Sequence, residues 1–309
     1  MAFVSLTVMW WKCPMAVSEG QLNAAALKAV ARTERRTFMG LTIPYLVMVI
    51  ALIVIPIGWL FYLSFIGRDG TFSFENYTRM LESKAYLRIF ITTFKISILT
   101  TILCAMLGYP LAYFMSQLSQ RWANICMIGV LIPFWTSLLV RTYAWLVLLQ
   151  KRGLVNDMAI DLGLIEEPIK FVHNTSGTLI GMVHIMLPFL ILPLYANMRA
   201  IDQNCLKAAS SLGARPSYAF WTVFFPLSIP GLLAGLLIVF VLCLGFYVTP
   251  AVLGGGKVIM VAMKITSNIE LYFSWGAASA LGVVLLVVTM AILFAASKLV
   301  SLDQLGGKG

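Results

Sequence analysis

Residues 206–231 read LKAASSLGARPSYAFWTVFFPLSIPG and carry two basic side chains, paired serines, two glycines and three prolines. Apolar runs flank this stretch, in a chain that is 61% hydrophobic and 11% charged, with a mean hydropathy of +0.93. Soluble domains contain roughly 25% charged residues. The composition therefore predicts a polytopic membrane protein, in which residues 206–231 form a polar element between two spans.

Six long runs almost free of charge predict membrane spans, because about 20 apolar residues cross a bilayer. A segment in hydrocarbon must satisfy its own backbone hydrogen bonds, so we expect an all-α protein with six transmembrane helices. The spans cover residues 41–65, 89–115, 123–149, 178–198, 228–250 and 276–297. Prolines in or at the ends of these runs predict kinks, namely Pro44, Pro56, Pro110, Pro133, Pro188, Pro193 and Pro250.

Basic residues predict the orientation of the spans. Arg32, Arg35 and Arg36 precede the first span, which usually dominates orientation, so we expect both termini and residues 206–231 in the cytoplasm. The first twenty residues lack the features of a signal peptide. They either lie on the membrane or reflect an early start codon. The expected parts are a cytoplasmic N-terminal segment (1–40), a transmembrane domain (41–298) with a cytoplasmic loop at about 199–227, and a cytoplasmic tail (299–309).

Several classes of function find no support in the sequence. The net charge is +10, but the basic residues are scattered, so we expect contacts with anionic lipid headgroups and none with nucleic acid. The five cysteines and two histidines show no spacing typical of a metal site or a disulfide framework. The run GGGK at 254–257 lacks the spacing of a nucleotide-binding loop. We therefore expect no catalytic site, metal or cofactor on this chain.

The polar element itself predicts two short helices joined by a tight turn. Ala208 to Leu212 favours a helix, Gly213 can end it with a positive φ, and Pro216 suits the first position of a second helix. A plain loop followed by an interfacial helix is the alternative.

This spacing resembles the cytoplasmic loop of the permease subunits of ATP-binding-cassette importers. Their pattern is Glu-Ala-Ala, three residues, Gly, nine residues, Ile, one residue, Leu-Pro. The resemblance implies a type I importer permease fold, and a loop that docks on the ATPase subunit and passes its motion to the spans. Lys207 departs from the pattern, since it reverses the charge of the expected glutamate. The matching positions are Lys207, Ala208, Ala209, Gly213, Val223, Phe225 and Pro226.

Two further stretches resemble the spermidine/putrescine permeases within that family. They are PFWTSLLVRTYAWLVLLQKRGLVN at 133–156 and LGFYVTPAVLGGGK at 244–257, and the whole resemblance covers about residues 40–298. Permeases for opines, 4-aminobutyrate and other amino-acid-derived solutes share these stretches. The resemblance thus implies import of a small cationic solute of polyamine type, with an amino-acid-derived solute as the alternative.

Arg141 is the most informative polar residue within the spans. An intramembrane charge usually faces a bundle interior or a water-filled cavity, although a purely structural arginine is the alternative. Lys95 lies near a span end and can reach the interface. No acid occurs within the six spans, so cation–π contacts worth roughly 0.5–2 kcal/mol each are the remaining attraction for a cation. The candidate rings, which could instead be packing or interfacial residues, are Trp135, Tyr143, Trp145, Phe246 and Tyr247.

The resemblance implies a permease subunit in the bacterial inner membrane. Its expected partners are a dimer of ATPase subunits, a second homologous permease, an extracytoplasmic solute-binding protein and membrane lipid. A self-sufficient secondary transporter would instead show intramembrane acids or inverted repeats. A membrane enzyme would need a polar catalytic constellation within the spans. The sequence shows neither, and we expect ATP hydrolysis on a partner subunit.

Overall fold

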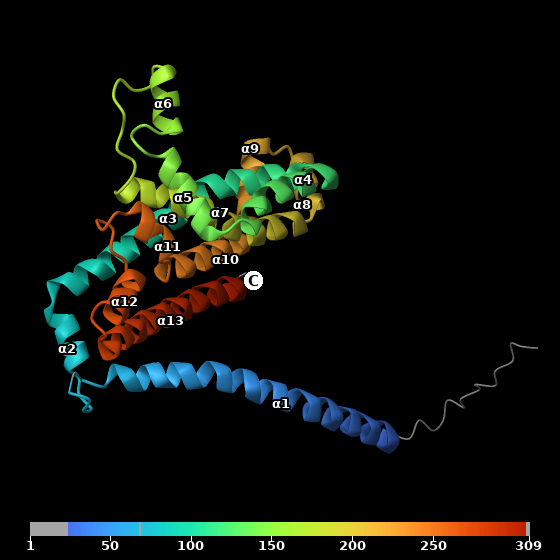
Figure 1. Ribbon diagram of the computed structural model, residues 1–309. Helices are drawn as coiled ribbons and strands as arrows, with labels where there is room; N and C mark the ends of the chain where they lie inside the picture. Colours follow the sequence, from blue (N-terminus) through green and yellow to red (C-terminus); the bar gives the residue numbers. More distant parts are fainter. Residues whose placement is uncertain (1–23, 68, 307–309) are drawn as a thin grey trace, which may run out of the picture. The chain divides into compact units, whose positions relative to one another are not determined.

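The structure is a computed structural model that describes residues 24–67 and 69–306. The described residues form helices joined by turns, with one isolated bridge between Ile66 and Phe72, which agrees with the predicted all-α class. Figure 1 shows the course of the chain. The long helices are α1 (Ala24–Ser64), α3 (Lys84–Gln117), α7 (Thr175–Ala200), α10 (Phe225–Leu244) and α13 (Trp275–Gly306).

Shorter helices connect these long ones. The first group is α2 (Glu75–Glu82), α4 (Gln120–Leu131), the 3-10 turn η1 (Ile132–Trp135), α5 (Leu138–Leu148) and α6 (Leu154–Asp161). The second group is α8 (Gln203–Ser211), α9 (Pro216–Ala219), the π-helix η2 (Phe220–Phe224), α11 (Val248–Leu253) and α12 (Val261–Glu270).

The chain divides into two compact units between Trp59 and Leu60. In the first, α1 continues through Pro44 and Pro56, and its most apolar window has no buried residue. The helix begins at Ala24, upstream of the expected start of the first span at residue 41. The first twenty residues, for which the sequence left two interpretations, lie outside the described residues.

In the second unit, α3, α7 and α10 pack against one another and form the core. Met186, Leu190 and Leu194 of α7 are fully buried in it. Gly231 of α10 makes a close approach, because a Cβ at this position would lie 2.4 Å from the Cβ of Asn197 on α7. Small residues allow membrane helices to approach in this way, since no hydrophobic force between helices compensates for poor contact in lipid.

The structure corrects two predicted spans. Residues 123–149 were expected to form one helix, but the segments Gln120–Trp135 and Leu138–Leu148 are bent by 96°. Pro133 lacks a backbone N–H and lies in the 3-10 turn, and Thr136 is extended, so the α-helical hydrogen bonding stops here. The fifth span was expected to reach Pro250, but α10 ends at Leu244 and Pro250 belongs to α11. Five helices in the described chain are long and apolar enough to span, or six if the bent pair counts as one span.

Candidate functional site

We call residues 202–219, which hold α8 and α9, the knob. The side chain of Asp202 accepts a hydrogen bond from the backbone N–H of Asn204, at 2.9 Å, and so caps α8. A carboxylate in this position satisfies one of the free donors of the first turn. Because of this cap, α8 begins at Gln203, five residues before the helix start that the sequence predicted at Ala208.

The turn of the knob is a Schellman motif. Gly213 has a φ of +83°, and its N–H donates to the carbonyl of Ser210 at 3.0 Å. The N–H of Ala214 donates to the carbonyl of Ala209 at 3.1 Å, which completes the pair of bonds that defines the motif. Arg215 is extended and Pro216 opens α9, so the two helices meet at a defined turn, as the sequence predicts.

The knob offers a partly apolar surface. A hollow of about 470 Å³ is formed by its turn and the following helix, with Leu212 and Tyr218 at its edge, 88% and 65% exposed. Lys207 and Ala208 are exposed on α8, whereas Ala209 is half-buried. A side chain at position 207 therefore changes the charge of the knob's surface and does not enter its packing.

An aromatic cluster joins the knob to the core. Beyond α9 the chain continues as the π-helix η2, whose Phe220 and Phe224 lie 5.1 and 5.0 Å from the ring of Tyr113 on α3. The hydroxyls of Tyr109 and Ser228 are 2.9 Å apart and link α3 to α10. Val223 and Phe225 are half-buried and Pro226 is exposed. The knob is thus continuous with a central helix, and π-helical turns are frequent at functional sites.

Arg199, at the end of α7, fixes the neighbouring chain. Its guanidinium donates to the carbonyl of Ser116 at 3.0 Å, to that of Leu118 at 3.2 Å and to the side-chain oxygen of Gln120 at 3.0 Å. These bonds tie α7 to the connection between α3 and α4. The end of α7, from which the chain continues into the knob, is therefore held in place by these hydrogen bonds.

We call Arg141, Trp145 and His184 the polar cluster. The indole N–H of Trp145 donates to Nδ1 of His184 on α7, at 3.0 Å, and the two rings meet edge to face. Arg141 lies one helical turn before Trp145 on the same face of α5. Its Nε is buried and has no hydrogen-bond partner among the described residues. The cluster therefore places a cation and an imidazole between two spans.

The structure separates the other expected pathway residues. Trp135 is 90% exposed at the bend and Tyr143 is 54% exposed on α5, so neither joins the polar cluster. Phe246 packs against the core, and Tyr247 precedes α11 with 41% of its surface exposed. The hydroxyls of Thr142 and Thr249, 3.4 Å apart, bring α11 against α5.

The comparison with known families decides what the chain is. The family described as the inner membrane component of binding-protein-dependent transport systems matches residues 105–302. The chain belongs to this family. It is a transport subunit and not itself an enzyme, as the sequence predicts.

Curated relatives of this transport component have similar lengths. This chain is 34% identical over 248 residues to the spermidine/putrescine transport system permease protein PotB of Haemophilus influenzae. The alignment covers 78% of this chain and 86% of the relative. The Escherichia coli K12 protein of that name is 30% identical, with 77% and 92% covered. The inner membrane ABC transporter permease protein YdcU of Escherichia coli K12 is 31% identical, with 60% and 67% covered.

Solved structures show the fold. A chain of a bacterial ABC transporter involved in the import of the acidic polysaccharide alginate matches with a TM-score of 0.68 at 15% identity, covering 89% of this chain and 98% of that one. A chain of that transporter in complex with a periplasmic protein that holds an alginate pentasaccharide also has a TM-score of 0.68, at 15% identity, with 86% and 94% covered. The transport component thus has the expected type I importer permease fold.

Sequence reasoning missed several residues of these sites. His184 stands alone in an apolar run, where a histidine gives no periodic signal. Tyr109 and Tyr113, four residues apart, share one face of α3, and this spacing could have indicated a ring cluster. The contacts of Arg199 with three separate groups depend on the tertiary structure, and its sequence position suggests only an orientation signal.

Proposed function

We propose that this chain is the permease subunit of an ATP-driven importer for polyamines of the spermidine/putrescine type. The observation that carries the proposal is its 34% identity, over 78% of its length, to a permease named for spermidine and putrescine. The aromatic residues near the bend and before α11 supply ring faces for a cationic solute in a pathway without acids.

In this proposal the knob docks on a dimer of ATPase subunits. A helical projection with a fixed turn can transmit a push without bending, and the small side chains of Ala208 and Ala209 allow close packing. A second homologous permease completes the pathway, and an extracytoplasmic solute-binding protein delivers the solute. The solved relative in complex with a periplasmic protein supports such a receptor. Both termini and the knob lie on the cytoplasmic side, with Lys207, Ala208, Ala209, Gly213, Val223, Phe225 and Pro226 as the coupling residues.

The coupling runs through the aromatic cluster. When ATP brings the ATPase subunits together, the knob moves and displaces η2, whose rings contact Tyr113 on α3. Movement of α10 against α3 then opens the pathway to the outside, and ATP hydrolysis resets it. The polar cluster lies on α5 and α7 and lines the pathway that this movement opens.

One observation favours a second candidate cargo. The buried Nε of Arg141 lacks a hydrogen-bond partner among the described residues, and a guanidinium binds carboxylates well. An amino-acid-derived solute such as 4-aminobutyrate carries a carboxylate, whereas a polyamine carries none and is repelled by Arg141. The two cargoes therefore predict different effects of removing this charge.

Uptake into vesicles that hold the assembled transporter distinguishes the two cargoes. For a polyamine, Arg141→Gln should leave putrescine uptake unchanged or raise it, because a repulsive charge is lost. Loss of one buried charge-assisted bond costs roughly 1.5–3 kcal/mol, so uptake of 4-aminobutyrate would instead fall about tenfold or more. Lys95→Gln, which removes an exposed cation on α3, is the control and should change neither. The polyamine proposal fails if wild-type vesicles take up 4-aminobutyrate and exclude putrescine.

A further inference from the structure

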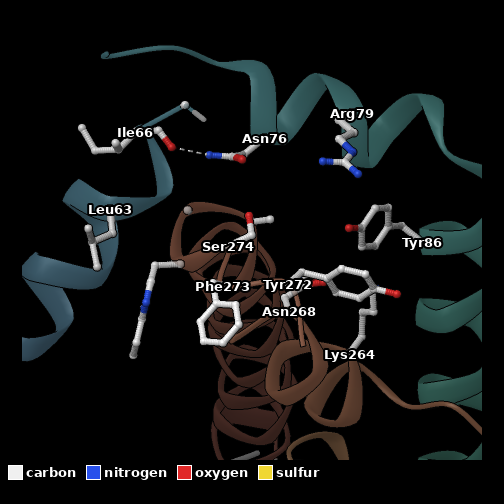
Figure 2. A pocket seen from close by; sticks show the side chains of 14 residues that line it. Leu63, Ile66, Asn76, Arg79, Tyr86, Lys264, Asn268, Tyr272, Phe273 and Ser274 are labelled. Atoms are coloured by element: carbon white, nitrogen blue, oxygen red, sulfur yellow. Dashed lines mark hydrogen bonds between the residues drawn. The ribbon is translucent and has the colours of Figure 1, made fainter. Parts of the chain in front are cut away.

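A cavity of about 630 Å³ lies where α2, α12 and the first turns of α3 and α13 meet. Figure 2 shows Arg79 entering it from α2, Tyr86 from α3, and Lys264, Asn268 and Tyr272 from α12 and the segment that follows. All of its lining residues belong to the unit that begins at Leu60.

The wall of the cavity is fixed by the side chain of Asn76. Its Nδ2 donates to the carbonyls of Ser64, at 3.1 Å, and Ile66, at 2.8 Å. Gly276 packs closely on this wall, because a Cβ there would lie 2.4 Å from the carbonyl oxygen of Ile66. The cavity is therefore built by specific contacts between three segments of the chain.

The lining is positively charged. Among the described residues, the guanidinium of Arg79 has no ion-pair partner, and no acidic side chain belongs to the lining. Lys264 Nζ lies 4.8 Å from the ring centroid of Tyr272 and 5.8 Å from that of Tyr86. These ring contacts hold the ammonium in place, and none of the described residues accepts a hydrogen bond from it. The carboxylate of Glu75 lies near Gly67 at the edge and is not part of the lining.

Asn268 gives an independent indication of a ligand. Its side chain lines the cavity and is only 3% exposed, yet its amide nitrogen has no hydrogen-bond partner among the described residues. Buried donors are normally satisfied in folded proteins. Two cations and a free donor around one space call for an anionic acceptor.

The cavity lies where two candidate spans begin, so we expect it at the level of lipid headgroups. Its lining includes Tyr86, in the first turn of the candidate span Lys84–Gln117, and Trp275, the first residue of the candidate span Trp275–Lys298. Tyr86, at the cavity, and Tyr113, at the aromatic cluster, are 27 positions apart on α3, about 40 Å at 1.5 Å per residue, so cavity and knob lie at opposite ends of this helix. Tyr272, Phe273 and Trp275, at the mouth, are 64%, 79% and 56% exposed. Tyrosine and tryptophan are enriched where spans meet the headgroups.

We propose that this cavity binds the phosphate headgroup of an anionic phospholipid. Arg79 and Lys264 neutralise the phosphate, rotation of the buried Asn268 amide lets it donate to one phosphate oxygen, and the acyl chains lie against Phe273 and Trp275. An acidic segment of a receptor would satisfy the same charges, but it would leave these large apolar side chains exposed to water. The site goes beyond the proposed function and does not depend on the identity of the cargo.

The test is retention of lipid by the assembled transporter. We would extract it from membranes of phosphatidylethanolamine and phosphatidylglycerol and analyse it by native mass spectrometry. The wild type should retain phosphatidylglycerol, and Arg79→Gln/Lys264→Gln should lower retention about tenfold, or roughly 1.4 kcal/mol. Lys84→Gln/Arg88→Gln removes two exposed charges from the first turns of α3 outside the cavity, and should retain lipid like the wild type. Arg79→Gln alone, at an exposed and unpaired side chain, lowers retention without a risk to folding.

Several outcomes would overturn the proposal. Equal retention by the wild type and the cavity variant would show that the cavity is not the lipid site. An equal loss of lipid retention in both double variants would show that retention depends on general surface charge and not on the cavity. Binding of added inorganic phosphate by the delipidated transporter, without rebinding of phosphatidylglycerol from vesicles of the same two lipids, would identify a free anion instead. Loss of receptor association with lipid retained would identify an acidic protein segment.

Discussion

Gly213 holds a backbone conformation that other residues adopt only with strain. Its φ of +83° and its N–H bond to Ser210 end α8 and turn the chain toward α9. Proline cannot meet either requirement, because its ring fixes φ near −65° and it has no N–H. The turn, and with it the stiffness of the knob, depends on this residue.

We therefore expect Gly213→Pro to insert in the membrane but to uncouple ATP hydrolysis from uptake. Forcing a residue into an unsuitable backbone region costs roughly 1–3 kcal/mol, so the knob should lose its turn before the spans lose their packing. The measurement is the ratio of solute taken up to ATP hydrolysed by the assembled transporter. Normal uptake by this variant would contradict the role of the knob.

The chain offers a matched control at the end of α6. Gly163 has a φ of +68°, its N–H donates to Ile160, and Leu164 donates to Ala159, which is the same motif outside the knob. Gly163→Pro should disturb its own turn equally and keep the ratio of uptake to hydrolysis. If both variants uncouple transport, the effect of Gly213→Pro is a general consequence of a broken turn.

Lys207 and His184 show what sequence can reveal at the scale of one residue. The spacing around Lys207 predicts the turn because the bonds of the motif join residues close in sequence. The partner of His184 is Trp145, 39 positions away, and such a contact depends on how two spans pack. Local geometry was therefore predictable here, whereas the polar cluster was not.

At the scale of elements, the close packing of α7 and α10 depends on Gly231. A methyl group at this position would meet the Cβ of Asn197 at 2.4 Å, and a Cβ cannot rotate away. We expect Gly231→Ala to destabilise the protein by about 1–3 kcal/mol, as overpacking of a core usually does. The free energy of unfolding in detergent measures this.

Gly282 is the matched control for that substitution. It lies in α13, and a Cβ there would meet nothing within 4 Å. Alanine favours a helix over glycine by roughly 0.5–1 kcal/mol, so Gly282→Ala should stabilise the protein slightly. Equal effects of the two substitutions would mean that Gly231 has no special role in packing.

The elements themselves were largely predictable, and their breaks were not. Hydropathy located the spans because it measures how favourably side chains transfer into lipid. This preference is similar for all residues of a span, so an average over about 20 residues detects it. Residues 123–149 are apolar on both sides of the 96° bend between Trp135 and Leu138. An average of hydropathy over that run therefore cannot detect the bend. Pro133 predicts a kink, but the direction of α5 follows from the bond between Trp145 and His184 of α7 and from its contacts with α11.

At the scale of the whole molecule, the proposed coupling requires the knob in the cytoplasm. A reporter fused after Gly213 should give a cytoplasmic signal, because the arginines before the first span favour an internal N-terminus. A fusion within the segment 151–170 should give the opposite signal, because one predicted span, residues 178–198, separates this loop from the knob. An extracytoplasmic signal from the knob would contradict both the orientation and its contact with an ATPase.

We expect this chain to conduct solute only when a separate ATPase drives it. Uptake of labelled putrescine into vesicles tests this most directly, with the chain reconstituted alone and with its partner permease, ATPase subunits and solute-binding protein. We predict uptake only by the full assembly and only with hydrolysable ATP. Uptake by the chain alone, in vesicles without an ATPase, would contradict its role as a subunit of an ATP-driven importer.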